Sequence, residues 1–292
     1  MVRKTCVVLF LQIALVSNPI TLLLDWWPNP HHVPLYYGIE RGIFMQEGIE
    51  LQLRKNSEAP NTVSFVAMKN VDAALFYMPQ AMRAAEKFPT RILCSLLVKP
   101  LQGLLKRRGT KVIKKIGGYP GTFYRKIAEK CGKDTQKVQI DNGLTLALYF
   151  DHVDAIYGGY PTIEGNQLKA SGVETEFVSS ESLGIPSFSE LVVIVHKDCN
   201  TELAHCLKRA LSRSIEAALH KPEDAFEAYL KANPDKTPYT ISWEKLAWKD
   251  TLPLLGAKLD STQINTFHTW MKKEHLLSET AEVSGCLFET LQ

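Results

Sequence analysis

The N-terminal part of the chain carries the clearest pattern of apolar and polar positions. Ile20 to Leu24 form a short continuous apolar run, which is typical of a buried strand. After a turn rich in aromatic and polar residues (25–30), apolar side chains recur at helical spacing from Val33 to Phe44, and a strand-like alternation follows from Ile49 to Leu53. These elements predict one β–α–β unit. In open α/β sheets ligands bind beyond the carboxyl ends of the strands, where this turn would lie.

The alternation of predicted strands and helices continues to residue 196. Two of the strands share a sequence, because Val71-Asp72-Ala73 and Val153-Asp154-Ala155 both follow a predicted helix and lead into an aromatic turn. This internal similarity favours two lobes of similar construction. Helical spacing dominates the C-terminal part of the chain, with predicted helices at 201–220, 222–232, 243–255 and 261–274.

This order of elements predicts an α/β fold of two lobes that close on a ligand like a hinged clamp. We expect residues 19–107 to form the first lobe and 108–192 the second, with 193–292 returning to the first lobe and ending in helices. The chain would cross between the lobes in the basic segment 106–115 and again at the apolar strand 191–196. The ligand would lie in the cleft between the lobes.

Composition agrees with a folded protein. The chain has 292 residues, of which 45% are hydrophobic and 22% charged, so it can bury a large core. Its 34 lysines and arginines are scattered among 31 acidic residues, so the charge gives no reason to expect a nucleic-acid partner. The basic run at 106–115 is typical of a solvated connection. The cysteines are widely spaced and fit neither a zinc site nor a disulfide framework, so we expect no metal ion.

Residues 1–18 have the pattern of a secretory signal peptide. Arg3 and Lys4 precede an apolar run from Cys6 to Val16 that is too short to span a bilayer. This pattern predicts an exported protein, located in the periplasm or another extracytoplasmic space. Because the cleavage signature is imperfect, the alternative is an uncleaved extension that packs on the fold, with a cytoplasmic location.

Aromatic and amide side chains fill the turn after the first predicted strand. We expect one of the pair Trp26 and Trp27 to face the core, and Trp27 to stack on a planar ring, with packing of both tryptophans as the alternative. Asn29 offers a donor and an acceptor that suit the polar edge of a heteroaromatic ring, and an ordinary Pro-Asn-Pro turn is the alternative. Tyr77, beside Phe76 at the end of a later strand, would form a second aromatic wall, with core packing as the alternative for Phe76.

Two further features add polar groups to the predicted cleft. Gly118 and Gly121, with Gly117, would let the backbone approach a ligand closely, and the amides before the next helix could bind an anionic or carbonyl oxygen. Glu190 precedes the apolar strand, so its carboxylate either pairs with an amino-bearing ring or lies on the surface. No G-x-S-x-G elbow or other catalytic arrangement is present, so we assign no catalytic residue.

Several segments together resemble one protein family. Successive segments of the SsuA/THI5-like (NMT1-type) proteins are similar, in the same order, to LDWWPNPHHVPLYYGIERGIFMQEGIEL (24–51), VDAALFY (71–77), KIGGYPGTF (115–123), VDAIYGGYPTIEGNQL (153–168) and GIPSFSELVVIV (184–195). The resemblance implies the type II periplasmic-binding-protein fold, and it implies that the turn with Tyr160 and Glu164 faces the ligand. Since His31 and His32 are adjacent, we expect only one of them to face the cleft, and the resemblance favours His32.

The resemblance implies two possible functions. Some family members are solute-binding proteins of ABC transporters, including ThiY-like proteins that bind pyrimidine precursors of thiamine. Others are thiamine pyrimidine synthases, which bind pyridoxal phosphate on a lysine and consume a histidine of their own chain. At those positions this chain has Phe76 and Gln80, and residues 185–190 lack the cysteine cluster of the synthases. We therefore expect a binding protein without a cofactor that delivers a formyl-aminopyrimidine type of ligand to an ABC permease, with the synthase as the alternative.

Overall fold

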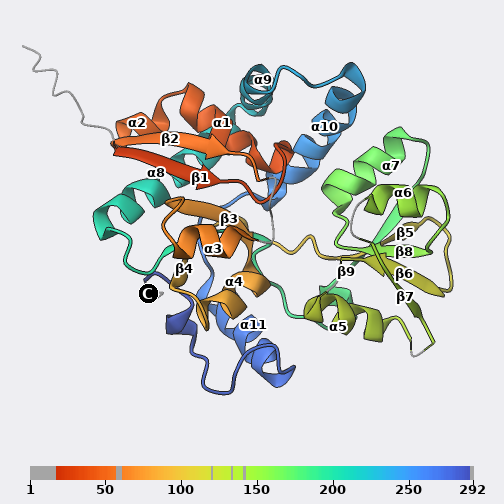
Figure 1. Ribbon diagram of the computed structural model, residues 1–292. Coiled ribbons are helices and arrows are strands. Elements are labelled where there is room, and N and C mark those ends of the chain that lie inside the picture. The colour runs from red at the N-terminus through yellow and green to blue at the C-terminus, as the bar shows by residue number, and fades with distance from the viewer. Residues whose placement is uncertain (1–17, 57–60, 120, 133, 141–142, 290–292) are drawn as a thin grey trace, which may run out of the picture.

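The chain folds into two lobes, each built on a five-stranded sheet (Figure 1). The computed structural model describes residues 18–56, 61–119, 121–132, 134–140 and 143–289. Apart from Asn18, the predicted signal peptide lies outside the described residues. The two lobes confirm the predicted α/β class. Within the described ranges, no helix is both long and apolar enough to cross a membrane.

The first sheet combines N-terminal strands with one strand from much later in the chain. Its order is β2 (Ile49–Arg54), β1 (Asn18–Leu23), β3 (Ala73–Tyr77), β10 (Leu191–His196) and β4 (Thr90–Leu97). Strand β1 runs parallel to β2 and β3, whereas β10 runs antiparallel to β3 and β4. The N-terminal β–α–β unit predicted from the sequence is therefore the parallel part of this sheet.

Helices cover both faces of the first sheet. One face packs against α1 (Val33–Glu40), α2 (Ile43–Gln46), α8 (Thr201–His220) and α9 (Pro222–Ala232). The other face packs against α3 (Thr62–Ala67), α4 (Met78–Ala85) and α11 (Ser261–Lys273). Consecutive residues of β10, such as Val192 and Val193, enter opposite apolar clusters. This burial on both faces explains why the central strands read as continuous apolar runs.

The second sheet lies wholly within the middle of the chain. Its order is β7 (Gln136–Gln139), β6 (Lys115–Gly118), β8 (Ala155–Tyr157), β5 (Gly103–Arg107) and β9 (Thr175–Ser179). Strand β6 runs parallel to β7 and β8, and β5 runs antiparallel to β8 and β9. The helical segments of this lobe are α5 (Thr122–Lys130), α6 (Leu144–Tyr149), the π-helical turn η3 (Pro161–Gly165) and α7 (Asn166–Ala170).

The chain crosses between the lobes at segments other than those expected. The crossing expected at 106–115 is wrong, because residues 103–107 form β5 and pair with β8 and β9 inside the second sheet. The chain instead crosses at residues 98–102, after β4. Residues 191–196 are a central strand of the first sheet, so the return crossing lies before them, within 180–190. The strands of the second lobe therefore span 103–179 rather than the expected 108–192.

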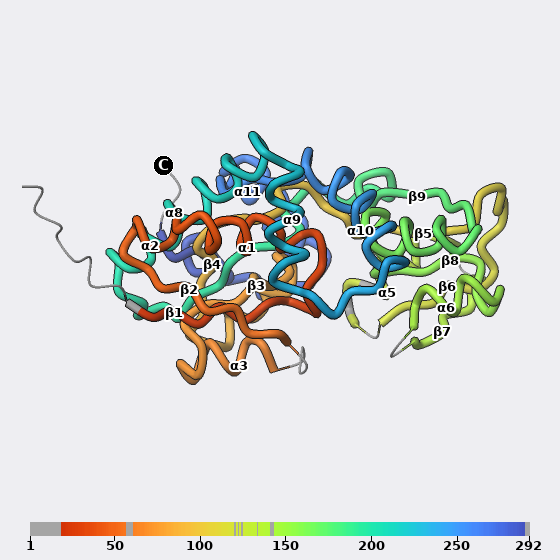
Figure 2. The backbone as a smooth tube through the Cα atoms, turned by 90° about the horizontal axis from the view of Figure 1, so that it is seen from above, coloured from red at the N-terminus to blue at the C-terminus, as the bar shows by residue number. Residues whose placement is uncertain are grey.

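Helix α10 (Pro238–Thr251) lies between the two lobes, as Figures 1 and 2 show. It contacts the short helix η1 (Pro30–His32) of the first lobe and both η3 and α7 of the second. The helix begins at Pro238, before the predicted start at Trp243, because the Thr237 hydroxyl caps it by accepting from the amide of Thr240. One helix from the C-terminal part of the chain thus contacts both lobes beside the predicted site.

Candidate ligand-binding site

Several of the predicted site residues, from both lobes, lie close together where the lobes meet. Asn29 follows β1, Tyr77 ends β3 and Tyr160 follows β8, so each lies at the carboxyl end of a strand. Glu190 directly precedes β10, which runs antiparallel to β3 and therefore begins at the same edge of the sheet. We call the group formed by Asp25, His31, His32, Tyr77, Tyr160, Thr162, Glu164 and Glu190 the lobe interface.

A buried hydrogen bond between a histidine and a carboxylate anchors the first-lobe side of the interface. The Nε2 atom of His32 lies 2.6 Å from Oδ1 of Asp25, and both side chains are buried. The backbone amide of Asn29 donates to Nδ1 of His32 at 3.3 Å, so the proton of the ring is on Nε2 and points to Asp25. Burial acts to raise the pKa of Asp25, but His32 and His31 outweigh burial and hold that pKa below its usual value.

The Glu190 carboxylate is the most heavily hydrogen-bonded group of the interface. Its Oε2 atom accepts from the backbone amides of Leu101 (2.7 Å) and Gln102 (3.0 Å). Its Oε1 atom accepts from Nε2 of Gln102 at 2.8 Å and from the hydroxyl of Tyr160 at 3.0 Å. The side chain is fully buried, so the alternative of a surface position is wrong. Burial raises the pKa of Glu190, although these hydrogen bonds act against that rise.

Direct contacts join the two lobes across the interface. The Nε2 atom of His31 lies 2.9 Å from the hydroxyl oxygen of Thr162, and its ring centroid lies 5.7 Å from that of Tyr160. Burial lowers the pKa of His31 to about 3, so the imidazole is neutral near pH 7. The hydroxyl of Tyr77 donates to Oδ2 of Asp25 at 3.4 Å. Tyr77 and Tyr160 are close enough to perturb each other's pKa, so polar groups continue from Asp25 to Glu190.

Glu164 adds a third carboxylate, on the second-lobe side. Its Oε2 atom accepts from the backbone amide of Tyr160 at 2.7 Å, which fixes the first turn of η3. Burial raises the pKa of Glu164 to about 7, and the backbone hydrogen bonds only partly oppose that rise. The nearby Tyr119 has a raised pKa, because of its own burial and the Glu164 charge. Glu164 therefore changes its charge close to neutral pH.

The aromatic turn differs from its prediction. The side chains of Trp26 and Trp27 are 43% and 54% exposed, so the expectation that one of them faces the core is wrong. Residues 25–28 form a bend instead of an extended strand, and side-chain alternation does not apply to a bend. The side chain of Asn29 accepts from the His31 amide at 2.9 Å and donates to the Trp27 carbonyl at 3.1 Å. It thus caps η1, and its contact with a ligand stays a prediction.

The glycines of the second lobe have different surroundings. Gly118 is buried at the end of β6, where it pairs with strands β7 and β8. Gly121 precedes α5 and is exposed, and a Cβ atom at this position would meet open space. A Cβ atom at Gly117 would lie 2.3 Å from Cδ1 of Ile140, so close packing accounts for this glycine. Backbone contacts from Gly118 and Gly121 to a ligand remain a prediction.

Three residues that the structure brings to the interface were not assigned from the sequence: Asp25, His31 and Thr162. A carboxylate directly after a buried strand is the sequence signal that marks Asp25. Both histidines belong to the interface, but only His31 contacts the other lobe, at Thr162, while His32 pairs with Asp25 of its own lobe. Contact of His32 with a ligand stays a prediction. No local pattern could reveal the contact between His31 and Thr162, since its two residues belong to different lobes.

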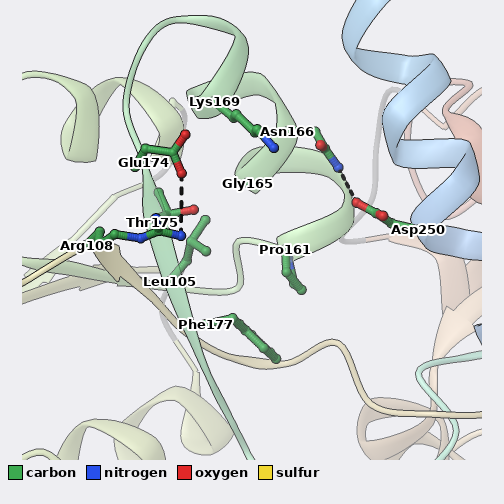
Figure 3. Close-up of a pocket in the computed structure, with 10 residues that line it drawn as sticks. All are labelled: Leu105, Arg108, Pro161, Gly165, Asn166, Lys169, Glu174, Thr175, Phe177 and Asp250. Atoms are coloured by element: carbon green, nitrogen blue, oxygen red, sulfur yellow. Dashed lines mark hydrogen bonds and ion pairs between the residues drawn. The ribbon is translucent and has the colours of Figure 1, made fainter.

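A separate cavity of about 240 Å³ lies beside η3 (Figure 3). It is lined by Leu105, Arg108, Pro161, Gly165, Asn166, Lys169, Glu174, Thr175, Phe177 and Asp250. Nη2 of Arg108 lies 3.6 Å from Oε2 of Glu174, and the amide of Asn166 donates to Asp250 at 2.9 Å. Two basic and two acidic side chains line this cavity, so their formal charges cancel. None of the residues predicted to bind the ligand is among its lining residues.

Known proteins are similar to this chain in both sequence and fold. A family model described as NMT1/THI5 like matches residues 29–225. A formylaminopyrimidine-binding protein of Halalkalibacterium halodurans is 25% identical over 260 residues, which cover 83% of this chain and 78% of that protein. A 4-amino-5-hydroxymethyl-2-methylpyrimidine phosphate synthase of Legionella pneumophila is 28% identical over 296 residues, which cover 93% of this chain and 91% of that protein.

Solved structures agree with the observed architecture. The periplasmic aliphatic sulphonate binding protein SsuA from Escherichia coli superposes with a TM-score of 0.68 at 10% identity, covering 93% of this chain and 98% of that chain. This similarity confirms the predicted fold, and the family model matches more than half of the sequence. The chain therefore belongs to the NMT1/THI5-like family and has the periplasmic-binding-protein fold.

Proposed function

We propose that this protein is the solute-binding component of an ABC transporter and that it holds a thiamine pyrimidine precursor of the formylaminopyrimidine type between its lobes. The observation that carries the proposal is the charge of the lobe interface. Asp25, Glu164 and Glu190 approach it from both sides, and their hydrogen-bond partners within the described ranges are histidine, tyrosine, glutamine and backbone amides. Among these partners there is no lysine or arginine.

Carboxylates without basic partners favour a ligand that donates hydrogen bonds. An aminopyrimidine has exocyclic N–H groups and a ring nitrogen that can be protonated, so it suits partly desolvated carboxylates. A sulfonate or phosphate would instead meet like charges, which is unfavourable in a buried site. Glu190 is the strongest candidate for the anchor, because backbone amides hold its position before any ligand arrives.

Aromatic side chains supply the apolar part of the proposed site. Tyr77 and Tyr160 lie at the interface from opposite lobes, and Trp27, in the turn that leads to Asn29, is half-exposed. Planar side chains of this kind stack on a heteroaromatic ring with little loss of conformational entropy. Closure of the lobes on the ligand would remove the ring from water and present the closed form to a permease.

A pyrimidine synthase is the second candidate, because one relative carries that name and matches 93% of this chain. Phe76 and Gln80 argue against this function. A phenylalanine side chain has no amine to form a Schiff base, so the residues present do not fit covalent attachment of pyridoxal phosphate. Phe76 instead packs against Tyr77, with ring centroids 6.0 Å apart. The amide oxygen of Gln80 is buried without a hydrogen-bond partner in the described part of the chain.

Export completes the proposal. The pattern of residues 1–18 and the fold of the periplasmic sulphonate binding protein both support a location outside the cytoplasm. Expression of the full-length chain with a C-terminal tag, followed by N-terminal sequencing of the product, tests this part. A mature N-terminus close to residue 18 supports export, and an intact N-terminus in the cytoplasm contradicts it.

Thermal unfolding with a panel of ligands tests the proposed function. The panel contains a formylaminopyrimidine, an alkanesulfonate and pyridoxal phosphate. We expect only the formylaminopyrimidine to raise the Tm, by on the order of 5–10 °C at roughly a hundred times its Kd. A shift with the alkanesulfonate alone would contradict the ligand assignment. An aldimine absorbance band with pyridoxal phosphate would support the synthase.

A further inference from the structure

Two side chains from the C-terminal part of the chain hold the backbone of the aromatic turn. The hydroxyl of Tyr229 lies 3.0 Å from the carbonyl oxygen of Pro28, and Nζ of Lys236 lies 3.3 Å from the same oxygen. Tyr229 belongs to α9, whereas Lys236 lies in the connection from α9 to α10. Residues distant in sequence thus meet at one carbonyl group directly before Asn29.

The peptide bond between Pro28 and Asn29 is therefore held at both ends. Its carbonyl accepts from Tyr229 and Lys236, while its N–H donates to Nδ1 of His32 at 3.3 Å. The bond to Nδ1 places the ring proton on Nε2, which faces Asp25 at 2.6 Å. The orientation of this one peptide plane thus determines how the turn presents its side chains and which histidine nitrogen carries the proton.

Glu244 of α10 holds the two clamping side chains in place. Its Oε1 atom lies 2.6 Å from Nζ of Lys236 and 3.1 Å from the hydroxyl of Tyr229. The single phenol proton serves Glu244 or Pro28 at one time, whereas the ammonium group can donate to both. The Nζ atom also lies 4.9 Å from the ring centroid of Tyr229, a favourable position for a cation over an aromatic face.

This cluster has features that stability alone does not explain. The side chains of Lys236 and Glu244 are 14% and 2% exposed, and Oε2 of Glu244 is buried without a hydrogen-bond partner in the described ranges. Replacing such a buried ion pair with apolar side chains is often neutral or stabilising. Glu244 lacks one hydrogen bond, and Lys236 contacts the Pro28 carbonyl next to the proposed ligand site. Orientation of that peptide group explains the pair better than stability does.

We propose that Tyr229, Lys236 and Glu244 are positioning residues, which fix the Pro28–Asn29 peptide plane and thereby the ligand-binding face of the aromatic turn. The inference rests on the proposed function insofar as the turn contacts a ligand. All three residues lie beyond the segment 29–225 that matches the family model. They act through the backbone of the turn and contact no ligand themselves.

The test replaces the polar groups of the three positioning residues with apolar side chains of similar size. In the variant Tyr229→Phe/Lys236→Met/Glu244→Met, the half-buried Pro28 carbonyl can take water, so we expect a Tm close to that of the wild type. Amide hydrogen exchange of residues 25–32 needs no ligand and reports the Asn29 N–H bond directly. We expect at least about tenfold faster exchange there and about tenfold weaker binding of the formylaminopyrimidine probe.

The control removes a Lys–Glu pair that joins α9, the helix of Tyr229, to the first lobe. Lys231 of α9 lies 3.0 Å from Glu40 of α1, on the surface, and Lys231→Met/Glu40→Met should change neither readout. Unchanged exchange at residues 25–32 in the triple variant would overturn the proposal. If the triple variant does not fold, Tyr229→Phe/Lys236→Met, which removes both donors to the Pro28 carbonyl and keeps Glu244, gives the same decision from the same exchange measurement. If the wild type fails to bind the probe, the proposed function falls, and the exchange result still decides the positioning role.

Discussion

The imidazole of His31 in the first lobe and the hydroxyl of Thr162 in the second lie 2.9 Å apart. His31 is neutral, because burial lowers its pKa to about 3, so this is a hydrogen bond between two uncharged groups. It joins the two lobes directly. Separating the lobes would break contacts of this kind, so the balance between a closed and an open form depends on a few contacts that substitution can remove.

Replacing Thr162 with valine keeps the shape of the side chain and removes the hydroxyl. We expect Thr162→Val to leave the buried Nε2 of His31 without a partner and to lower the free energy of unfolding by about 1–3 kcal/mol. It should also raise the radius of gyration in small-angle scattering, because the open form gains population. The exposed Thr269 of α11, whose hydroxyl donates to the Asn265 carbonyl, offers the control Thr269→Val. Equal effects of both substitutions would contradict a contact specific to lobe closure.

Helix α10 provides a second set of interlobe contacts. Asp250 accepts from the amide of Asn166 at 2.9 Å, and the hydroxyls of Tyr239 and Ser171 lie 2.8 Å apart. We expect Asp250→Ala/Tyr239→Phe to shift the protein toward the open form and to weaken ligand binding by about fivefold, since about 1 kcal/mol of closing free energy is lost. Calorimetric titration gives the change in Kd. An unchanged Kd together with an unchanged scattering profile would show that α10 does not contribute to closure.

The pH dependence of stability should carry the signature of Glu164. Burial raises the pKa of this carboxyl to about 7 in the folded protein, from an ordinary value of 4.5. The folded state thus binds the proton more tightly, so the contribution of Glu164 to stability is complete below about pH 4.5 and is lost as pH rises through about 7. Denaturant unfolding should show this loss, roughly 1–3 kcal/mol between about pH 5 and about pH 8, in the wild type. In Glu164→Gln this component should vanish, and a parallel loss in the variant would assign it to another group.

Glu190 should be the most sensitive single position for binding. Substitution of Glu190 by glutamine removes the negative charge and places an N–H donor against groups that already donate to this side chain. We expect Glu190→Gln to weaken binding of a formylaminopyrimidine on the order of tenfold to a hundredfold. The partly exposed Glu176 of β9, which pairs with Lys106 at 2.8 Å, provides the control Glu176→Gln. Equal affinities of the wild type and Glu190→Gln would remove Glu190 from the site.

The fold was accessible from the sequence mainly where burial leaves a periodic pattern. The strand at 191–196 is recognisable because both of its faces are buried and its residues are apolar without alternation. The sheet to which it belongs depends on hydrogen bonds with β3 and β4, which are distant in sequence. For the same reason residues 103–107 could not be assigned to the second lobe, since only their pairing with β8 and β9 places them there.

The sequence allowed individual site residues at the ends of strands to be predicted, but not the hydrogen bonds that connect them. Glu190 could be singled out because it precedes a buried apolar strand, and Tyr160 because its turn resembles the corresponding segment of the family. Their hydrogen bond, and the contact of His31 with Thr162, follow from how the lobes approach each other. The two exposed tryptophans could not be oriented, because the alternation rule holds for extended strands and residues 25–28 bend. Tyr229 and Lys236, which contact the Pro28 carbonyl, lie in a C-terminal part of the chain whose sequence carries no recognisable motif.

We expect the carboxylates of the lobe interface, which lack basic partners, to select an amino-bearing ring over an anion. Isothermal titration of the purified protein near neutral pH, with a formylaminopyrimidine and then with an alkanesulfonate, tests this claim most directly. We predict saturable binding of one formylaminopyrimidine per chain and no detectable heat of binding for the sulfonate. Saturable binding of the sulfonate, with none of the pyrimidine, would contradict the claim.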